Sequence, residues 1–235
     1  MNNLLKTMKT SLDMLDRAIQ GTVVMSMDLE QMGAKFLDDK VPLKWEAVGY
    51  PSLKPLSSWV TDFILRVNFL AKWLYEGPPK SFWVSAFFFP QGFMTASLQT
   101  YARKTQTPID ALQFKTNIKG IFEEQVEEAP EDGVNIHGLF LEGARWDFKK
   151  GTIEDSNPRE PIVPFPVIWL EPVDINEVLD EGCYPCPFYK TSVRRGELST
   201  TGHSTNFVRF HQLPSEVQAD YWLRRGAALL SMTDD

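Results

Sequence analysis

An aromatic segment at residues 82–94 constrains this 235-residue chain more than any other feature. Six of its first twelve positions are Phe or Trp, and burying apolar area contributes roughly 25 cal/mol per Å², so the segment belongs in a core. Pro90 fixes its own φ and turns the preceding residue away from helix, and the apolar spacing becomes helical after Gly92. We therefore expect a buried, extended entry and then a short helix. It would end at Arg103 and Lys104, two cations that suit a helix C-terminus.

Composition narrows the class of protein. The net charge of −7 argues against nucleic acid or an anionic membrane as the partner, and no apolar run is long enough to span a bilayer. The N-terminus lacks the long apolar centre of a signal peptide. Two cysteines favour a reducing, intracellular setting over a disulfide framework. The 43% of hydrophobic residues suffices for a sizeable core.

The first 40 residues are predicted to form two amphipathic helices separated by Gly21. The first apolar face comprises Leu4, Leu5, Met8, Leu12, Leu15 and Ile19, and the second comprises Val24, Met27, Met32 and Phe36. A helix pair of this size needs a packing partner to be stable. We interpret the segment as part of a longer polypeptide, packed on an element upstream or on the rest of this chain.

A proline-rich loop at 42–55 follows, which we expect Trp45 and Tyr50 to anchor. Ser57 or Ser58 can cap the next helix, whose apolar residues recur at threes and fours over 59–74. The Gly-Pro-Pro sequence at 77–79 ends it.

The hydrophobic period changes to two after residue 112, which predicts strands. Apolar runs recur six times between turn signals, at 114–118, 134–141, 161–172, 184–191, 206–213 and 221–230. The prolines of the third run place it at a sheet edge or a bulge, and the last run is ambiguous between helix and strand, with strand preferred. The predicted fold is α+β, with a helical subdomain over 1–112 and a roughly six-stranded, incomplete β-barrel over 113–235.

No motif predicts catalysis, because the phosphate-loop, dinucleotide-binding and nucleophile-elbow patterns are all absent from the sequence. Cys183 and Cys186 form a Cys-x-x-Cys, but a structural zinc site needs four ligands and no second pair accompanies them. Two prolines favour extended chain there, so a structural thiol pair is preferred over a metal or redox site.

Two further groupings of polar residues are weaker candidates. The hydroxyl residues beside His203, at 198–206, are interpreted as a polar turn in preference to a nucleophilic site. Glu142 and Asp147, with Arg145 between them, favour an ion-paired turn over acid–base catalysis, with Trp146 as its buried anchor.

Several long motifs resemble the C-terminal region of dynein heavy chains. They lie, in the family's order, at 82–93, 102–104, 108–110, 137–147, 186–191, 198–206 and 222–230, and so span nearly the whole chain. The motif at 138–147 is similar to axonemal rather than cytoplasmic dyneins, and the aromatic segment is most similar to inner-arm chains. Ala86 departs from the glycine of many relatives. The motif positions singled out for a structural role are Phe89, Pro90, Gly92, Phe93, Arg103, Gly143, Arg145, Trp146, Gly202, His203, Asn206, Trp222 and Gly226.

The resemblance implies a module on one face of the AAA+ ATPase ring of a microtubule motor in the axoneme of a cilium or flagellum, within the cytoplasm and cytoskeleton. It implies helices followed by a six-stranded incomplete barrel. It also implies that ATP, magnesium and microtubules are bound by other parts of the heavy chain, with no cofactor or metal site here. The leading hypothesis is a non-catalytic structural and regulatory module. The alternative is a free-standing module that docks another axonemal protein, and an enzyme ranks third.

Overall fold

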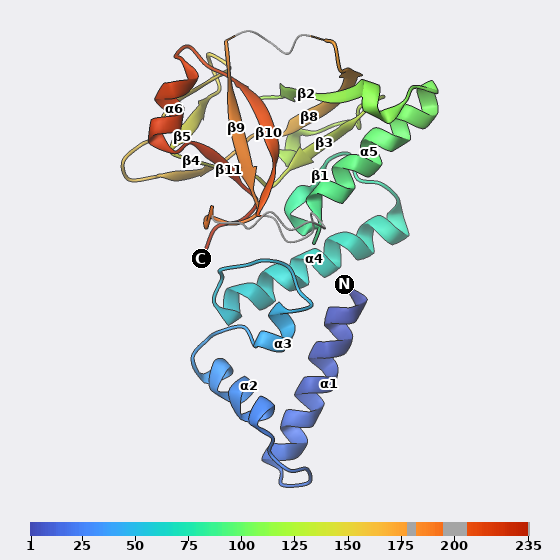
Figure 1. Ribbon diagram of the computed structural model, residues 1–235, viewed down its shortest axis with the longest axis vertical. Helices are drawn as coiled ribbons and strands as arrows, with labels where there is room; N and C mark the ends of the chain where they lie inside the picture. The colour runs from blue at the N-terminus through green and yellow to red at the C-terminus, as the bar shows by residue number, and fades with distance from the viewer. Residues whose placement is uncertain (178–181, 195–205, 235) are drawn as a thin grey trace. The chain divides into compact units, whose positions relative to one another are not determined.

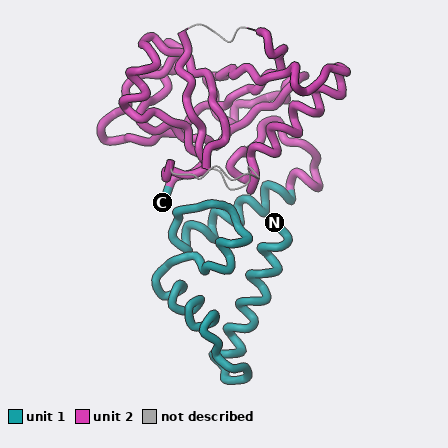
Figure 2. Tube along the Cα trace, viewed as in Figure 1, with its two compact units in different colours: residues 1–71, 234–235 teal, residues 72–233 magenta. Residues whose placement is uncertain are grey.

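The computed structural model describes residues 1–177, 182–194 and 206–234, and the chain divides into two compact units (Figure 1, Figure 2). Unit 1 comprises residues 1–71 and 234–235, and unit 2 comprises residues 72–233. The predicted subdomain boundary at 112 differs from this division. Helix α5 (Pro90–Thr105) belongs to unit 2 because it packs on strands β2 (Leu112–Ile118) and β10 (Phe207–Pro214). The mixture of helices and strands confirms the α+β class.

Unit 1 is helical and contains α1 (Asn2–Ile19), α2 (Met27–Leu37), α3 (Leu43–Glu46) and the first part of α4 (Leu56–Glu76). Both predicted N-terminal helices are therefore confirmed. Their shared core consists of Leu15, Ala18, Leu29 and Met32, with Phe36 packed against it. The second predicted stripe is partly wrong, because Val24 precedes α2 and both Val24 and Met27 are largely exposed.

An aromatic stack holds the proline-rich loop to α4. Trp45 and Tyr50 are both buried against Trp59, with ring centroids 5.9 Å and 5.6 Å away, so the prediction that they anchor the loop is confirmed. The predicted cap of α4 is wrong. The helix begins at Leu56, and the Asp39 carboxylate accepts the backbone N–H of Ser57 at 3.0 Å. The cap thus comes from outside the local sequence.

The aromatic segment enters unit 2 as β1 (Phe82–Trp83) and a 3₁₀ turn, η1 (Val84–Ala86), before α5 begins at Pro90. Phe93 from α5 stacks on Phe87 with centroids 4.3 Å apart and packs on Phe82 at 4.9 Å. The expected extended entry and helix are confirmed.

Three sheets follow (Figure 1). The four-stranded sheet has the order β1-β3-β8-β2, with β3 at Val134–His137 and β8 at Ile168–Asp174. The five-stranded sheet has the order β10-β9-β11-β4-β7, in which β9 is Cys183–Tyr189, β11 is Ala228–Leu230, β4 is Phe140–Glu142 and β7 is Ile162–Pro164. Strands β5 (Ala144–Asp147) and β6 (Thr152–Asp155) form a hairpin. A single core cluster draws side chains from all three sheets and from α5.

These sheets correct the predicted barrel of about six strands. The described residues contain more, shorter strands, because bends such as the one at Gly138 split the long apolar runs. The run at 221–230 is helix α6 (Ala219–Arg225) followed by β11, not one strand. The predicted edge position holds for β7, whereas β8 is central; Pro172 lies beyond the end of its pairing with β3, at Leu170.

Candidate interaction site

The outer surface of unit 1 carries more apolar side chains than its own core uses. On α1 the buried positions are Leu4, Ser11, Leu15 and Ala18. Leu5, Leu12 and Ile19 form a second stripe and are 41%, 43% and 70% exposed. Their spacing of seven residues brings them within about 20° per step of one another around the helix. Helix α1 therefore has two apolar faces, and only one of them is covered within the described residues.

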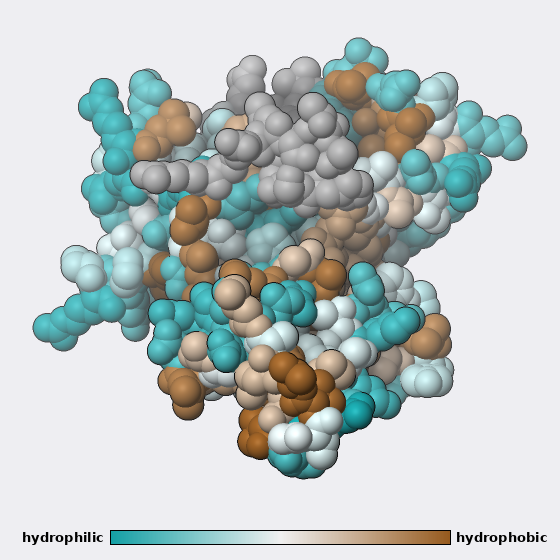
Figure 3. All heavy atoms as spheres, turned by 60° about the horizontal axis from the view of Figure 1, so that its bottom comes forward, coloured by the Kyte–Doolittle hydropathy of each residue, from teal (hydrophilic) through white to brown (hydrophobic). Residues whose placement is uncertain are grey.

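A second group of exposed apolar residues lies around α2. Val24 and Met27 flank its start, and Leu37 at its end is 90% exposed. Figure 3 shows hydrophobic side chains gathered on the end of unit 1 that faces the viewer. We call Leu5, Leu12, Ile19, Val24, Met27 and Leu37 together the apolar surface of unit 1. Patches of this kind mark interaction sites more often than they mark free surface.

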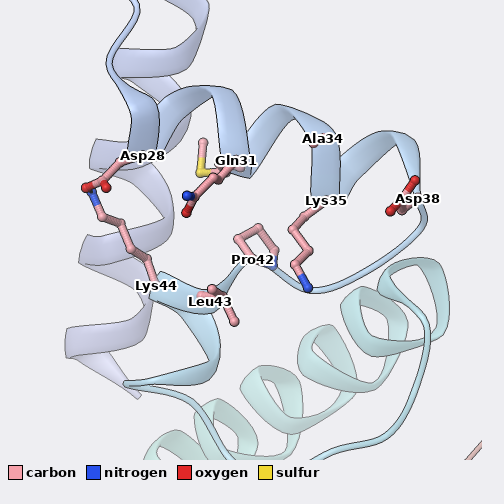
Figure 4. Close-up of a pocket in the computed structure, with 9 residues that line it drawn as sticks. Asp28, Gln31, Ala34, Lys35, Asp38, Pro42, Leu43 and Lys44 are labelled. Atoms are coloured by element: carbon pink, nitrogen blue, oxygen red, sulfur yellow. The ribbon is translucent and has the colours of Figure 1, made fainter.

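A pocket of about 520 Å³ opens between α2 and α3, beside this surface (Figure 4). Met32 and Pro42 supply apolar lining, and the Lys44 side chain reaches Asp28 with Nζ and Oδ2 2.8 Å apart. Both charges are more than half exposed, so the pair contributes little to stability. The pocket offers an apolar hollow with a charged rim, which suits a side chain from a packing partner.

The aromatic-segment motif residues meet at the start of α5. Phe89 precedes the helix, Pro90 is buried at its first position, and Phe93 stacks as described. A Cβ at Gly92 would lie 2.4 Å from Cδ1 of the Phe89 ring, so this position has no room for a larger residue unless that ring moves. Arg103, in the last turn, is exposed, as expected of a cation at a helix C-terminus.

The later motif residues meet where α6 joins the sheets. Gly226 ends α6 in the left-handed region (φ +66°), which glycine adopts without strain. Gly143 lies against the carbonyl oxygen of Arg225. Trp222 is buried, and its indole Nε1 donates to Ser215 Oγ at 2.7 Å. These contacts are packing, with no nucleophile or base among them.

Arg145 and Trp146 lie on opposite faces of the β5–β6 hairpin. Trp146 is buried and meets Phe165 edge to face, with centroids 5.7 Å apart. Arg145 Nε lies 2.7 Å from Oε1 of Glu154 across the hairpin. The expected ion pair therefore forms with a different carboxylate, because Asp147 accepts the backbone N–H groups of Lys149 and Lys150 instead.

Asn206 is buried and links two segments. Its Oδ1 accepts from the backbone N and from Oγ1 of Thr191, at 2.9 and 3.1 Å, and its Nδ2 donates to the carbonyl of Thr191 at 3.2 Å. Gly202 and His203, together with most of the hydroxyl-rich motif, lie outside the described residues.

The cysteine pair has the predicted extended conformation. Cys183 and Cys186 lie in β9, three residues apart, so their side chains point to opposite faces of the strand. Both are free thiols, and burial raises the pKa of the Cys186 thiol well above its usual range. Within the described ranges, no three His, Cys, Asp or Glu side chains are grouped closely enough to bind a metal. Likewise, no described helix combines the length and apolarity needed to cross a bilayer.

One network of polar side chains that the sequence did not reveal has the composition of a hydrolase triad. Ser81 Oγ lies 2.8 Å from Nδ1 of His137, and Nε2 of His137 lies 2.9 Å from Oε2 of Glu123. However, Ser81 is only 4% exposed while the Glu123 side chain is 56% exposed, so solvent reaches the carboxylate and not the hydroxyl. Burial lowers the pKa of His137 to about 4 and raises that of Glu123. We interpret the network as a tether between β3 and the turn η3 (Glu123–Gln125).

The helical unit, the three sheets and the shared core at residues 82–230 define a domain without an assembled active site among its described residues. The family model for the C-terminal domain of dynein heavy chains matches residues 1–231, and the protein belongs to this family. It is 47% identical to human dynein axonemal heavy chain 6 over 97% of its length. Over its whole length it is 46% identical to human dynein axonemal heavy chain 12 and 47% identical to human dynein axonemal heavy chain 3. The 235 residues span only 6–8% of the length of these relatives.

Proposed function

We propose that this protein is a non-catalytic structural and regulatory module of an axonemal dynein heavy chain. In this proposal it packs on the AAA+ ring of the motor through the apolar surface of unit 1. Membership of the C-terminal domain family supports the proposal, as does the sequence, which lacks a phosphate-loop motif. ATP and magnesium would then be bound elsewhere in the motor. The module would act in the axoneme, and its place in an inner arm stays a prediction.

The uncovered stripe on α1 carries this proposal. Leu5, Leu12 and Ile19 repeat at the spacing of one helix packed along another, and they lie outside the core that α1 shares with α2. Full burial of each such side chain stabilises a complex by roughly 1.5–3 kcal/mol. A body bound across ring subdomains shifts the balance of ring conformations by the difference between its contacts in each state.

The same stripe suits the second candidate function, a binding module for another axonemal protein. Binding of the purified protein to a motor ring fragment, compared with retention of proteins from axonemal extract, distinguishes the two. We expect saturable binding to the ring fragment. A protein that ignores the ring but retains an axonemal partner through the same stripe would favour the binding module.

The variant with Leu12→Asp and Ile19→Asp tests which surface is used. It should weaken ring binding about a hundredfold or more, because two apolar side chains are lost from the interface. Ile175→Asp is the matched control, since Ile175 is an exposed apolar residue in unit 2. Equal binding by the double variant and the control would show that α1 is not the docking surface.

A further inference from the structure

A second pocket, of about 530 Å³, lies within unit 2 between α5, β2 and β10. Strands β2 and β10 are the end strands of the four-stranded and the five-stranded sheet. Helix α5 contacts both, and Gln91 Nε2 donates to the carbonyl of Phe207 at 2.9 Å. We call this pocket the β2–β10 groove. It lies where the two sheets approach each other without forming a continuous ladder.

Arg209 brings a positive charge into the wall of the β2–β10 groove. Its Nε donates to the carbonyl of Phe210 at 3.1 Å and its Nη2 to the carbonyl of Phe114 at 3.4 Å, while the guanidinium lies 5.3 Å from the Phe114 ring centroid. None of the ion pairs among the described residues involves Arg209. Burial lowers its pKa to about 10, which still leaves it cationic at neutral pH.

A purely structural role accounts for part of this arrangement. Pro172 is the register partner of Phe114 on β8 and has no N–H, so Arg209 supplies a donor to the Phe114 carbonyl. That role uses one of five N–H groups, and the bond to Phe210 uses a second. It also needs no positive charge, whereas a cation held away from water is costly unless it is paired. The remaining donors and the charge fit an anionic partner.

The rest of the lining adds an apolar wall and several polar groups. Met94 and Leu98 contribute from α5 and Phe210 from β10, while Gln113 and Gln212 add side-chain amides. Pockets that combine apolar walls with a few convergent polar groups are typical ligand sites. Sheet edges of this kind also accept extended peptides, whose backbone pairs with the edge while alternate side chains enter the groove.

We propose that the β2–β10 groove binds an extended acidic peptide segment, with one carboxylate on Arg209 and an apolar side chain against Leu98 and Phe210. A guanidinium can bind a carboxylate through two parallel hydrogen bonds, which fixes the register of such a segment. This site lies within unit 2 and does not depend on ring docking through unit 1. The net charge of −7 disfavours acidic peptides elsewhere on the protein, so their binding requires a local cationic site.

Fluorescence anisotropy with the 235-residue protein tests the proposal. The probe is a fluorescein-labelled peptide of alternating Glu and Leu, and its counterpart has Lys in place of Glu. We expect saturable binding of the acidic probe, and weaker binding of it as the salt concentration rises. Arg209→Met should weaken this binding about tenfold or more, because it removes the charge and retains apolar bulk. Arg103→Met is the control, since Arg103 is an exposed cation on α5 that does not line the groove.

A second variant keeps the test decisive if Arg209→Met does not fold. Gln212→Glu places a carboxylate in the groove and leaves Arg209 intact, and it should weaken binding of the acidic probe to a similar extent. Circular dichroism would establish that each variant is folded. Absence of saturable binding by the wild-type protein, or unchanged binding by folded Arg209→Met, would overturn the proposal. If Arg209→Met is unfolded, unchanged binding by Gln212→Glu overturns it. Equal binding of the acidic and lysine probes would also overturn it, because the groove would then bind apolar side chains without regard to charge.

Discussion

Replacing Trp146 measures how much the β5–β6 hairpin contributes to the core of unit 2. The Trp146 side chain is 7% exposed and meets Phe165 edge to face at 5.7 Å. Truncating a buried Trp to Ala costs roughly 3–5 kcal/mol, because apolar contact is lost and a cavity remains. We therefore expect Trp146→Ala to lower the free energy of unfolding by about 3 kcal/mol or more. The melting temperature should fall by about 6 °C or more.

Trp146→Phe separates ring burial from the indole N–H. That N–H is buried and has no acceptor among the described residues, so removing it relieves a desolvation cost of roughly 1–3 kcal/mol. The relief offsets the smaller ring, and we expect a net loss within about 1 kcal/mol. Arg145→Ala is the neighbouring control. Its ion pair with Glu154 is about half exposed and should contribute less than about 1 kcal/mol.

Urea denaturation followed by far-ultraviolet circular dichroism gives these free energies, provided that the denaturant slope is the same for each variant. An unchanged midpoint for Trp146→Ala would show that the ring contributes nothing to the core. A Trp146→Phe variant as unstable as Trp146→Ala would refute the argument from the unpaired N–H, because ring size would then determine the whole effect.

Three further predictions concern single side chains. Asp39→Ala should cost about 1 kcal/mol of stability in thermal unfolding, because Ser57 at the start of α4 loses its capping acceptor; Asp39→Asn, which keeps an acceptor and tolerates the left-handed backbone there, should cost less. Cys183 should react with a thiol reagent before Cys186, which should react only on unfolding, and simultaneous reaction of both in the folded protein would contradict the burial of Cys186. Burial lowers the pKa of His211 well below its usual value, so its contribution to stability is complete above about pH 6.5 and is lost as the pH falls below that. His211→Leu should therefore flatten the dependence of melting temperature on pH between about 7 and 5, and an unchanged slope would show that other groups determine it.

Local patterns predicted the parts of the fold that are stabilised locally. The apolar residues at threes and fours over 59–74 marked α4, and the aromatic segment marked the entry to unit 2 and α5. The run at 221–230 failed because α6 has only seven residues, too few for a clear helical period, before Gly226 ends it. The predicted cap of α4 failed because the acceptor, Asp39, lies eighteen residues from Ser57.

The interaction site was predictable in part. Two apolar faces on α1 are visible in the sequence, but which of them becomes covered depends on where α2 and α3 pack. The β2–β10 groove left no sequence signal, because it assembles from three distant segments around Gln91, Gln113 and Arg209. Strand pairing across such distances is set by the whole core and not by any local period.

The central claim is that this module tunes a motor ring without taking part in its chemistry. A motor that lacks residues 1–235, assayed beside the full-length motor for ATP hydrolysis and microtubule gliding, tests it most directly. We predict that hydrolysis persists, with its rate or the gliding velocity changed several-fold, as expected for coupling of about 1–3 kcal/mol. Complete loss of hydrolysis by a folded ring would show that the module is part of the active machinery, and identical motility in both motors would show that it does not tune the ring.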